Sequence, residues 1–277
     1  MHVTPTDLRV VRREGGLILR FSVLDSVACV LAEVTGEGSR TTSLEEYCER
    51  PHWGIVLRGT LTIERHSQRT RILPGQGFHV PAGAPAHRFV AQSRTVFGGF
   101  VALGSQASVI DDAAVEDIVR SSVGAANGSA APGSNGDAAG AGVELRIGGA
   151  DSEQPLEEGA IEVTSTPMGR WIYTRARFGP TSGYGSGLCD IPHWGIVLEG
   201  SATIDYEDDV EVVGAGDFYA CPIGPPGHRL EVADGATIAD FTARSSFTPG
   251  RRVAEWRSTP ETLGSVAEAR AEGSSRH

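Results

Sequence analysis

One twelve-residue stretch of the sequence occurs twice and constrains the fold more than any other feature. It reads CERPHWGIVLRG from Cys48 and CDIPHWGIVLEG from Cys189, and in each copy a histidine follows four positions after the cysteine, at His52 and His193. Further along, APAHR recurs as PPGHR at the same offset of 141 residues. An insertion or deletion between the two signatures would have changed that offset. The chain is therefore a tandem duplication, and we predict two copies of one folded unit.

The length of the chain gives the same number of domains. At about 150 residues for each domain, 277 residues correspond to roughly two. The segment 121–142 reads SSVGAANGSAAPGSNGDAAGAG, a composition typical of a flexible tether. We therefore expect a first domain at 1–120, a linker at 121–142, a second domain at 143–260, and a C-terminal helix with a frayed tail at 261–277.

Short β-type runs fill both halves of the sequence. They are apolar or alternating, and Gly, Pro and charged turns separate them. In the first half they are LILRFSVL, ACVLAEV, HWGIVL, TLTIERH, FHVPAG and TVFGGFVAL; in the second they are RWIYTRARF, HWGIVL, SATIDYE, VEVVGAG, DFYACP and TIADFTAR. Many short strands at close spacing predict an antiparallel sandwich or barrel. A short helix is expected after each one, at 111–121 and 259–270.

Charge and hydropathy exclude several classes of partner. The net charge of −11 opposes binding of nucleic acid, which needs a clustered positive surface. No apolar run approaches the roughly 18 residues of a membrane span, and no hydrophobic segment follows the N-terminal charges. We expect a cytoplasmic protein with no membrane and no nucleic-acid partner. All 24 basic residues are arginine, so lysine Schiff-base chemistry is excluded.

Each repeat carries a cysteine and two histidines at the same spacing. The first set is Cys48, His52 and His87; the second is Cys189, His193 and His228. Residues four apart on a strand share a face, so we expect the thiol and the imidazole to point into one cavity, with the later histidine alongside. Sulfur with nitrogen suits Zn²⁺, and three protein ligands with one open position are typical of catalytic zinc. We predict a divalent metal in each repeat, with zinc ranked first and iron second.

These residues resemble the motifs of a bicupin, two cupin barrels in one chain. The second cupin motif, G-x5-P followed by a turn and His, reads as Gly75, Pro81 and His87 in the first repeat, and recurs in the second with His228. The resemblance implies an all-β fold of two tandem antiparallel barrels, the double-stranded β-helix, and a metal such as Fe, Mn or Ni as an alternative to zinc. It also implies that such barrels pair, within the chain or as a homodimer.

The first cupin motif departs from the family pattern. Where the family has Glu, this chain has the signature histidine, and where the family has its second His, this chain has the signature cysteine. The family's first His corresponds to Glu46 in one repeat and Gly187 in the other. Glu46 is therefore a candidate fourth ligand or general base, and Gly187 offers the second repeat no such group. The two barrels are expected to differ in activity.

The functional hypotheses follow from the metal site. The first is a metal-dependent enzyme, of the lyase, isomerase, hydrolase or dioxygenase kind, in which the metal activates water or polarises a carbonyl of a small oxygenated or carboxylate molecule. The second is a binding module that holds a metal or a metabolite without turnover, as a sensor or storage protein. The third is a structural zinc that fastens two strands. An iron-dependent dioxygenase is a further alternative within the first.

Overall fold

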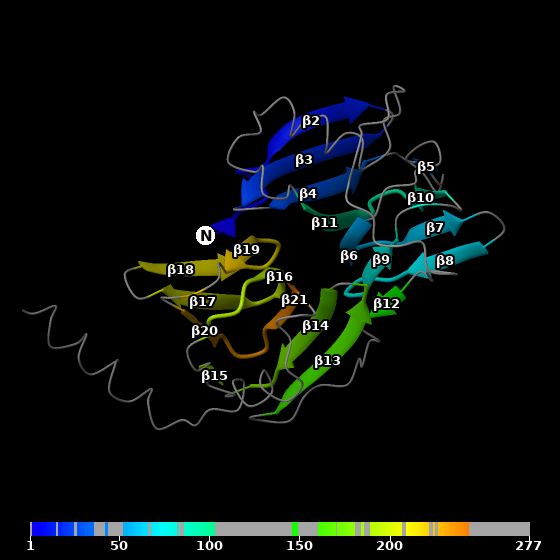
Figure 1. The fold of residues 1–277 in the computed structure, drawn as a ribbon. Coiled ribbons are helices and arrows are strands. Elements are labelled where there is room, and N and C mark those ends of the chain that lie inside the picture. Colours follow the sequence, from blue (N-terminus) through cyan, green and yellow to red (C-terminus); the bar gives the residue numbers. More distant parts are fainter. Residues whose placement is uncertain are drawn as a thin grey trace, which may run out of the picture. The chain divides into compact units, whose positions relative to one another are not determined.

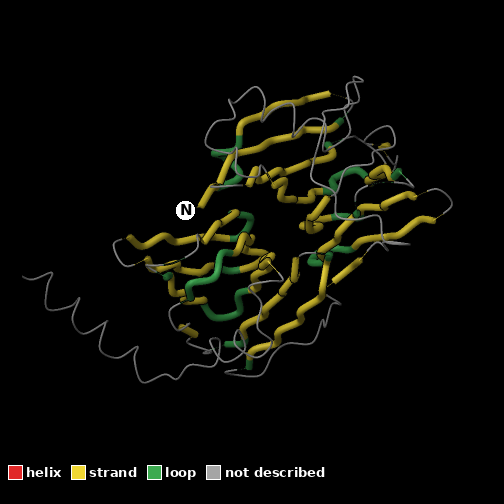
Figure 2. Tube along the Cα trace, viewed as in Figure 1, coloured by secondary structure: helices red, strands yellow, loops and turns green. Residues whose placement is uncertain are grey.

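The computed structural model describes 16 segments of the chain, and within them the elements are strands and turns with no helix (Figures 1 and 2). The described residues are 2–14, 16–24, 27–35, 42–43, 52–65, 68–81, 83, 86–102, 146–148, 160–169, 171–180, 184–185, 189–206, 209–221, 224 and 227–243. The helices predicted at 111–121 and 259–270 lie outside them. No helix among these residues is long and apolar enough to cross a bilayer.

The chain divides into two compact units. The first unit comprises the described residues of Val3–Asp151 together with Thr166–Tyr173; the second comprises those of Met1–His2, Ser152–Ser165 and Thr174–His277. Barrel 1 and barrel 2 denote the pair of sheets that makes up most of the first and of the second unit. The ends of the predicted linker, 121 and 142, lie outside the described residues, so the predicted domain boundaries stay predictions.

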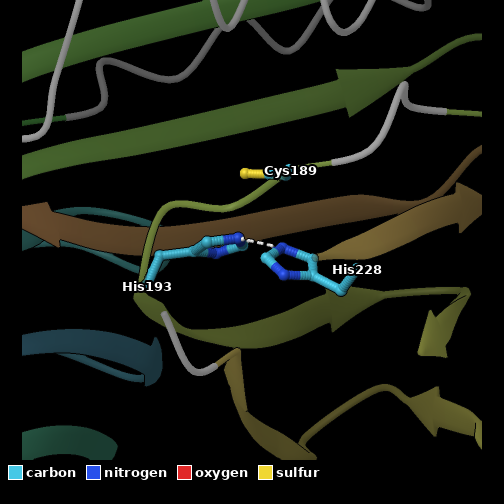
Figure 3. A group of neighbouring side chains, drawn as sticks. All are labelled: Cys189, His193 and His228. Carbon is cyan, nitrogen blue, oxygen red and sulfur yellow. Dashed lines mark hydrogen bonds between the residues drawn. The ribbon is translucent and has the colours of Figure 1, made fainter. Parts of the chain in front are cut away.

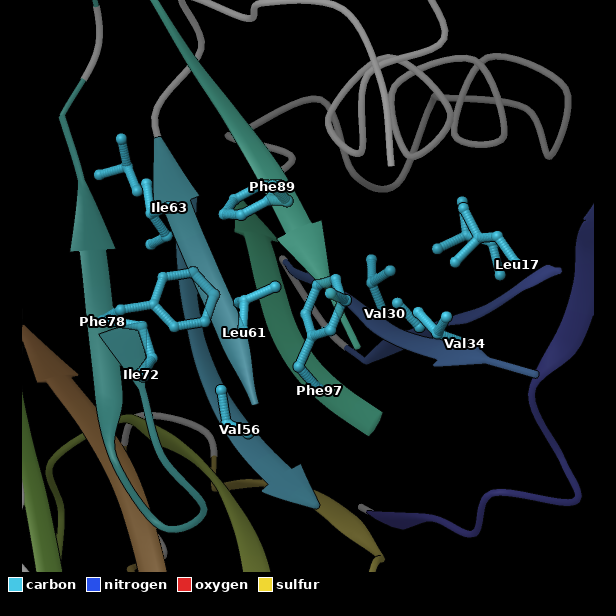
Figure 4. Packing of buried hydrophobic residues seen from close by; sticks show 14 of the residues in the cluster. Leu17, Val30, Val34, Val56, Leu61, Ile63, Ile72, Phe78, Phe89 and Phe97 are labelled. Atoms are coloured by element: carbon cyan, nitrogen blue, oxygen red, sulfur yellow. The ribbon is translucent and has the colours of Figure 1, made fainter. Parts of the chain in front are cut away.

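Barrel 1 is built from two antiparallel sheets. The seven-stranded sheet has the order β12 (Arg146–Gly148), β9 (Gly77–Val80), β6 (His52–Arg58), β11 (Val96–Ala102), β4 (Val27–Val34), β3 (Leu17–Leu24) and β2 (Arg9–Glu14). The four-stranded sheet has the order β5 (Thr42–Ser43), β10 (His87–Ala91), β7 (Leu61–Arg65) and β8 (Gln68–Ile72). Both sheets contribute side chains to one apolar core, which includes Val56, Ile63, Ile72, Phe89 and Phe97 (Figure 4). The alternation of apolar residues along these strands therefore faces this shared core.

Barrel 2 repeats the arrangement. Its six-stranded sheet has the order β1 (His2–Val3), β19 (Phe218–Cys221), β16 (His193–Glu199), β21 (Thr237–Ala243), β14 (Trp171–Phe178) and β13 (Ile161–Met168). The four-stranded sheet has the order β15 (Tyr184–Gly185), β20 (His228–Val232), β17 (Ser201–Tyr206) and β18 (Asp209–Gly214). Its core again draws on both sheets, with Val197 and Ile238 from one and Ile204 and Leu230 from the other.

Each barrel borrows a short strand from the opposite half of the sequence. The N-terminal β1 is the edge strand of the six-stranded sheet, and Nδ1 of His2 lies 3.6 Å from Oε2 of Glu211. In the other direction β12, which begins the second half of the chain, pairs with β9 of barrel 1, with Ile147 opposite Phe78. The repeat pattern did not predict this exchange, because two or three residues carry no readable periodicity.

The glycine that ends each signature has a steric cause. Gly59 and Gly200 turn the chain from β6 into β7 and from β16 into β17, with φ of +78° and +73°. A Cβ would lie 2.7 Å from the hydroxyl of Thr95 in the first turn and 2.9 Å from Ala236 in the second. Both the backbone conformation and the close contact therefore require glycine.

The predicted strands are confirmed, and the strands that sequence reasoning missed are mostly exposed or edge strands. The burial of β8, for example, leaves only Ile72 inside, and most of β13 is half-buried or exposed. Such strands carry little apolar alternation, which is the signal on which a prediction depends.

Candidate metal centre

Three side chains converge inside barrel 2 (Figure 3). The ligand atoms of Cys189, His193 and His228 all lie within 4.8 Å of one another, and all three residues are buried. Nε2 of His193 lies 2.7 Å from Nε2 of His228. The sequence predicted that these three residues would meet, and the structure brings them together.

The reason for their meeting differs in part from the one that we predicted. Cys189 does not share a continuous strand with His193, because β16 begins at His193 itself. The backbone of Cys189 instead forms an isolated antiparallel bridge with His228, with both N–H···O distances at 2.8 Å. The thiol is therefore placed by the first residue of β20, and the intervening Asp190–Pro192 segment leads the chain across to β16.

The registers of β16 place further polar side chains around His193. In one row of the sheet, Cys221 of β19 and Thr242 of β21 lie directly opposite His193 on its two sides. Directly opposite residues of an antiparallel pair point to the same face. Cys221 belongs to the apolar core of barrel 2, and so does Tyr219, which lies two positions before it on β19. The row Cys221–His193–Thr242 therefore faces the interior.

The next row consists of Tyr219, Gly195 and Asp240. A Cβ at Gly195 would overlap the ring and hydroxyl of Tyr219, so this glycine leaves room for the tyrosine to cross the sheet. Asp240 is 1% exposed, and its Oδ2 lies 3.7 Å from Nδ1 of His193. His193 thus has a carboxylate near one ring nitrogen and a second imidazole at the other.

The thiol of Cys221 and the phenol of Tyr206, which also lie in this interior, are neutral near pH 7. Burial raises the pKa of the Cys221 thiol, and a hydrogen bond with Tyr206 offsets part of that shift. Burial, with the neighbouring Cys221, also raises the pKa of the Tyr206 phenol. Oγ1 of Thr242 is buried and has no hydrogen-bond partner among the described residues. An unpaired buried hydroxyl costs about 1–3 kcal/mol, which a bound ligand would recover.

In barrel 1 the structure describes two of the predicted site residues. The rings of His52 and His87 are in edge contact, with centroids 4.8 Å apart, and Phe89 packs on both. Cys48 and Glu46 lie outside the described residues, so their predicted roles stay predictions.

The environment of His87 perturbs its imidazole strongly. It is completely buried, and neither ring nitrogen has a hydrogen-bond partner among the described residues. Burial, and then the nearby Arg65, lower the pKa of His87 to about 4. The ring is therefore neutral at pH 7 and keeps a lone pair for a ligand.

Residues next to the histidines lie on the other face of the sheet, where they stack, form an ion pair or are exposed. Trp53 stacks on His79 with ring centroids 5.2 Å apart and 9° between the planes. Arg88, adjacent to His87, binds Oε2 of the buried Glu64 through Nη2 at 2.7 Å. Its counterpart Arg229 is exposed.

The three donor atoms in barrel 2 fit a divalent metal. In a tetrahedral site with Zn–N near 2.0–2.1 Å and Zn–S near 2.3 Å, donor atoms lie about 3.3–3.6 Å apart. The observed distances between the three donor atoms run from 2.7 Å up to 4.8 Å. Side-chain rotations that move the donor atoms by about an ångström would therefore produce the tetrahedral spacing. Neutral imidazoles and a thiol that ionises on binding are the donor types that zinc prefers.

Comparison by sequence gives no relatives: no protein-family model and no curated protein matches the chain. Comparison by structure gives many. An oxalate decarboxylase variant from Bacillus subtilis matches with a TM-score of 0.58 at 13% identity, covering 90% of this chain and 78% of that one. The protein Ylba from E. coli matches at 0.57 and 12%, covering 89% and 91%. AerE from Microcystis aeruginosa matches at 0.54 and 10%, covering 85% and 96%.

These neighbours are cupin-type proteins, and this chain has the same fold, with two antiparallel barrels in tandem. Identities of 10–13% show the fold and leave the reaction open. One of the oxalate decarboxylase structures concerns the Mn(II) centres of that enzyme. Among the residues that the structure describes, the group of side chains that could hold a metal is Cys189, His193 and His228.

Sequence reasoning missed three polar residues around His193: Tyr219, Asp240 and Thr242. The signal was available in the alignment of the two repeats. At the same offset of 141, barrel 1 has Phe78, Gly99 and Val101 in their places. A position that is polar in one copy and apolar in the other marks where the copies have diverged chemically.

Proposed function

We propose that the chain is a metal-dependent bicupin enzyme that acts on a small oxygenated molecule in barrel 2. Cys189, His193 and His228 hold one divalent ion, with zinc ranked first and iron second. The observation that carries this proposal is the convergence of the three donor atoms within 4.8 Å in a buried interior. Bound there, the metal supplies a Lewis acid that polarises a carbonyl or activates a water molecule.

The residues of the chain divide the work around that ion. We assign Asp240 the role of orienting the His193 ring from the Nδ1 side, where its Oδ2 lies at 3.7 Å, which leaves Nε2 for the metal. Thr242, directly across the strand pair from His193, brings a buried hydroxyl with no partner among the described residues. This hydroxyl is the group best placed to hydrogen-bond an oxygen of the ligand. The apolar core beyond Val197 excludes water from the other end of the barrel.

The first experiment is elemental analysis of the protein purified without chelators. We expect a transition metal bound in the wild type, and its loss from barrel 2 in the Cys189→Ala variant. Cys29→Ala is the matched control, because Cys29 is another buried thiol and lies in β4 of barrel 1. Wild-type protein without metal above background would contradict the proposal.

The second experiment tests turnover. Metal-loaded protein is incubated with a panel of small carboxylates, diketones and phenols, and products are followed by NMR. Turnover that disappears in Cys189→Ala and persists in Cys29→Ala supports an enzyme. Binding of panel members without any product favours the alternative, a metal- or metabolite-binding protein without catalysis.

A further inference from the structure

The two barrels place different charges around equivalent histidines. The first difference concerns the histidine that begins β6 and β16. Asp240 lies opposite Gly195 in barrel 2, and the corresponding pair in barrel 1 is Gly99 opposite Gly54. The buried carboxylate near His193 therefore has no counterpart near His52 at this position. A Cβ at Gly99 would lie 2.7 Å from the carbonyl oxygen of Trp53, so the backbone of barrel 1 leaves no room for a side chain there.

The second difference concerns the histidine that begins β10 and β20. In barrel 1, Arg65 lies directly opposite His87; in barrel 2 the equivalent of Arg65 is Tyr206, directly opposite His228. Arg65 shares its face of β7 with the core residue Ile63, two positions before it. The guanidinium group thus extends from the interior face beside His87, and guanidinium stays charged at any working pH. Tyr206 places a neutral phenol at the same position.

Both differences change the affinity for a cation in the same direction. A carboxylate near the outer nitrogen of a metal-binding imidazole fixes the ring and strengthens binding, and removal of such a group typically costs 10–100-fold in metal affinity. A fixed positive charge beside the other imidazole opposes an incoming divalent cation through Coulomb repulsion in a poorly solvated interior. At these two described positions, barrel 2 has a carboxylate and a neutral phenol, whereas barrel 1 has a glycine and an arginine.

We propose that the two barrels have specialised: barrel 2 is the tight metal site because Asp240 positions His193, and barrel 1 is the weak one because Arg65 lies beside its histidine pair. This inference rests on the proposed metal site of barrel 2 and adds that the chain carries one ion when metal is limiting. Asp240 acts as a positioning residue, and Arg65 acts as a charge that excludes the cation.

The surroundings of Asp240 favour a positioning role for its carboxylate over a role in packing. A buried carboxylate is expensive to desolvate unless a partner stabilises it. The residues on either side along its own face of β21 are Ile238 and Thr242, neither of which is charged. Oδ2 of Asp240 lies 3.7 Å from Nδ1 of His193, and the thiol of Cys221, neutral near pH 7, is also close to this carboxylate. The carboxylate and the imidazole therefore form a pair directed at the site.

The test is a calorimetric titration of metal-stripped full-length protein, with zinc as the only metal and with a competing chelator present. We expect two steps that differ by at least tenfold in Kd. Cys189→Ala should abolish the tight step and His87→Ala the weak one, which assigns each step to its barrel. Two equal steps would overturn the inference and leave the proposed function intact; no binding at all would overturn both.

Two reciprocal variants test the causes. Asp240→Asn should weaken the tight step by about 10–100-fold. Its control is Asp205→Asn, the same chemical change at a residue on the outward face of β17. Arg65→Tyr, which copies barrel 2, should strengthen the weak step by tenfold or more, with the exposed Arg69→Tyr as its control. Equal effects of a variant and its control would contradict the assigned role.

A spectroscopic measurement separates positioning from a purely structural role. In protein loaded with one equivalent of Co²⁺, the thiolate-to-metal charge-transfer band should disappear in Cys189→Ala. In Asp240→Asn the visible bands should shift in position, since the His193 ring is no longer held, while Asp240→Glu should restore them toward the wild type. Unchanged bands in Asp240→Asn would contradict the positioning role, even if the variant protein were less stable than the wild type.

Discussion

Nε2 of His193 lies 2.7 Å from Nε2 of His228, although 35 residues separate them in the chain. Each histidine is the first residue of its strand, and the strands belong to different sheets of barrel 2. The contact therefore depends on the closure of the two sheets around one core. At this distance one of the two nitrogens must donate a proton to the other, because two bare lone pairs would repel; a metal ion would take the place of that proton once the rings move apart.

A metal that bridges these nitrogens should stabilise the folded protein measurably. Since the donor set exists only in the folded state, zinc at a free concentration 100 times its Kd should add about 2.7 kcal/mol to the free energy of unfolding of barrel 2. We expect zinc to raise the melting temperature of the wild type by several degrees, as followed by differential scanning calorimetry. Replacement of His228 by Ala should remove that increase.

The control for this measurement is Cys29→Ala, which lowers stability through loss of a buried thiol in barrel 1 but should keep the full response of barrel 2 to zinc. An equal response to zinc in His228→Ala and in the wild type would contradict the assigned ligand.

The perturbed imidazole of barrel 1 predicts a dependence of stability on pH. The pKa of His87 is lowered to about 4 in the folded protein, from about 6.5 in the unfolded chain. A depressed folded-state pKa means that the unfolded state takes up the proton first. The stabilising contribution is therefore complete above pH 6.5 and is lost as the pH falls from 6.5 to 4. At about 1.36 kcal/mol for each pKa unit, the loss is at most about 3 kcal/mol.

Urea unfolding of metal-stripped protein at pH 7.5, 5.5 and 4.5 checks this prediction. His87→Phe should be less dependent on pH in this range than the wild type, because Phe89 and His52 already form an aromatic surround that can accept the ring. His2→Gln is the control, since His2 is a partly exposed histidine outside the core. A pH dependence unchanged by His87→Phe would show that His87 does not cause it.

The doubled signature was sufficient to predict the number of barrels, the ligand candidates and most inward-facing strands. Its information came from repetition: His52 and His193 follow the same local sequence, so their structural equivalence could be inferred without knowing a single contact. Strand exchange by β1 and β12 could not be inferred, since each has at most three residues. The proximity of Asp240 to His193 depends on the register between β16 and β21, which local sequence does not encode.

The glycine of the HWG signature in barrel 2 should be intolerant of even a methyl group. A Cβ at Gly195 would overlap the ring of Tyr219, so Gly195→Ala forces the ring to move within a packed core. Overpacking of this kind typically costs about 1–3 kcal/mol. We expect a loss of that size in the free energy of unfolding, measured by urea denaturation.

A double-mutant cycle identifies the contact responsible. In a Tyr219→Leu background the alanine at position 195 has no ring to displace, so its cost should fall to well under half. If Gly195→Ala costs the same with and without the tyrosine, the clash with Tyr219 is not its cause.

The turn glycines of barrel 2 offer a matched pair that separates backbone strain from steric contact. Gly200 and Gly235 have nearly identical φ values, +73° and +71°. A Cβ at Gly200 would lie 2.9 Å from both Cα and Cβ of Ala236, whereas nothing lies within 4 Å of the corresponding position at Gly235. Gly235→Ala therefore reports only the left-handed backbone conformation, at roughly 1–2 kcal/mol. Gly200→Ala should cost at least about 1 kcal/mol more, because Ala236 is fully buried and cannot easily retreat. Urea denaturation of the two variants side by side measures the difference, and equal losses of stability would mean that the turn after β16 relaxes away from Ala236.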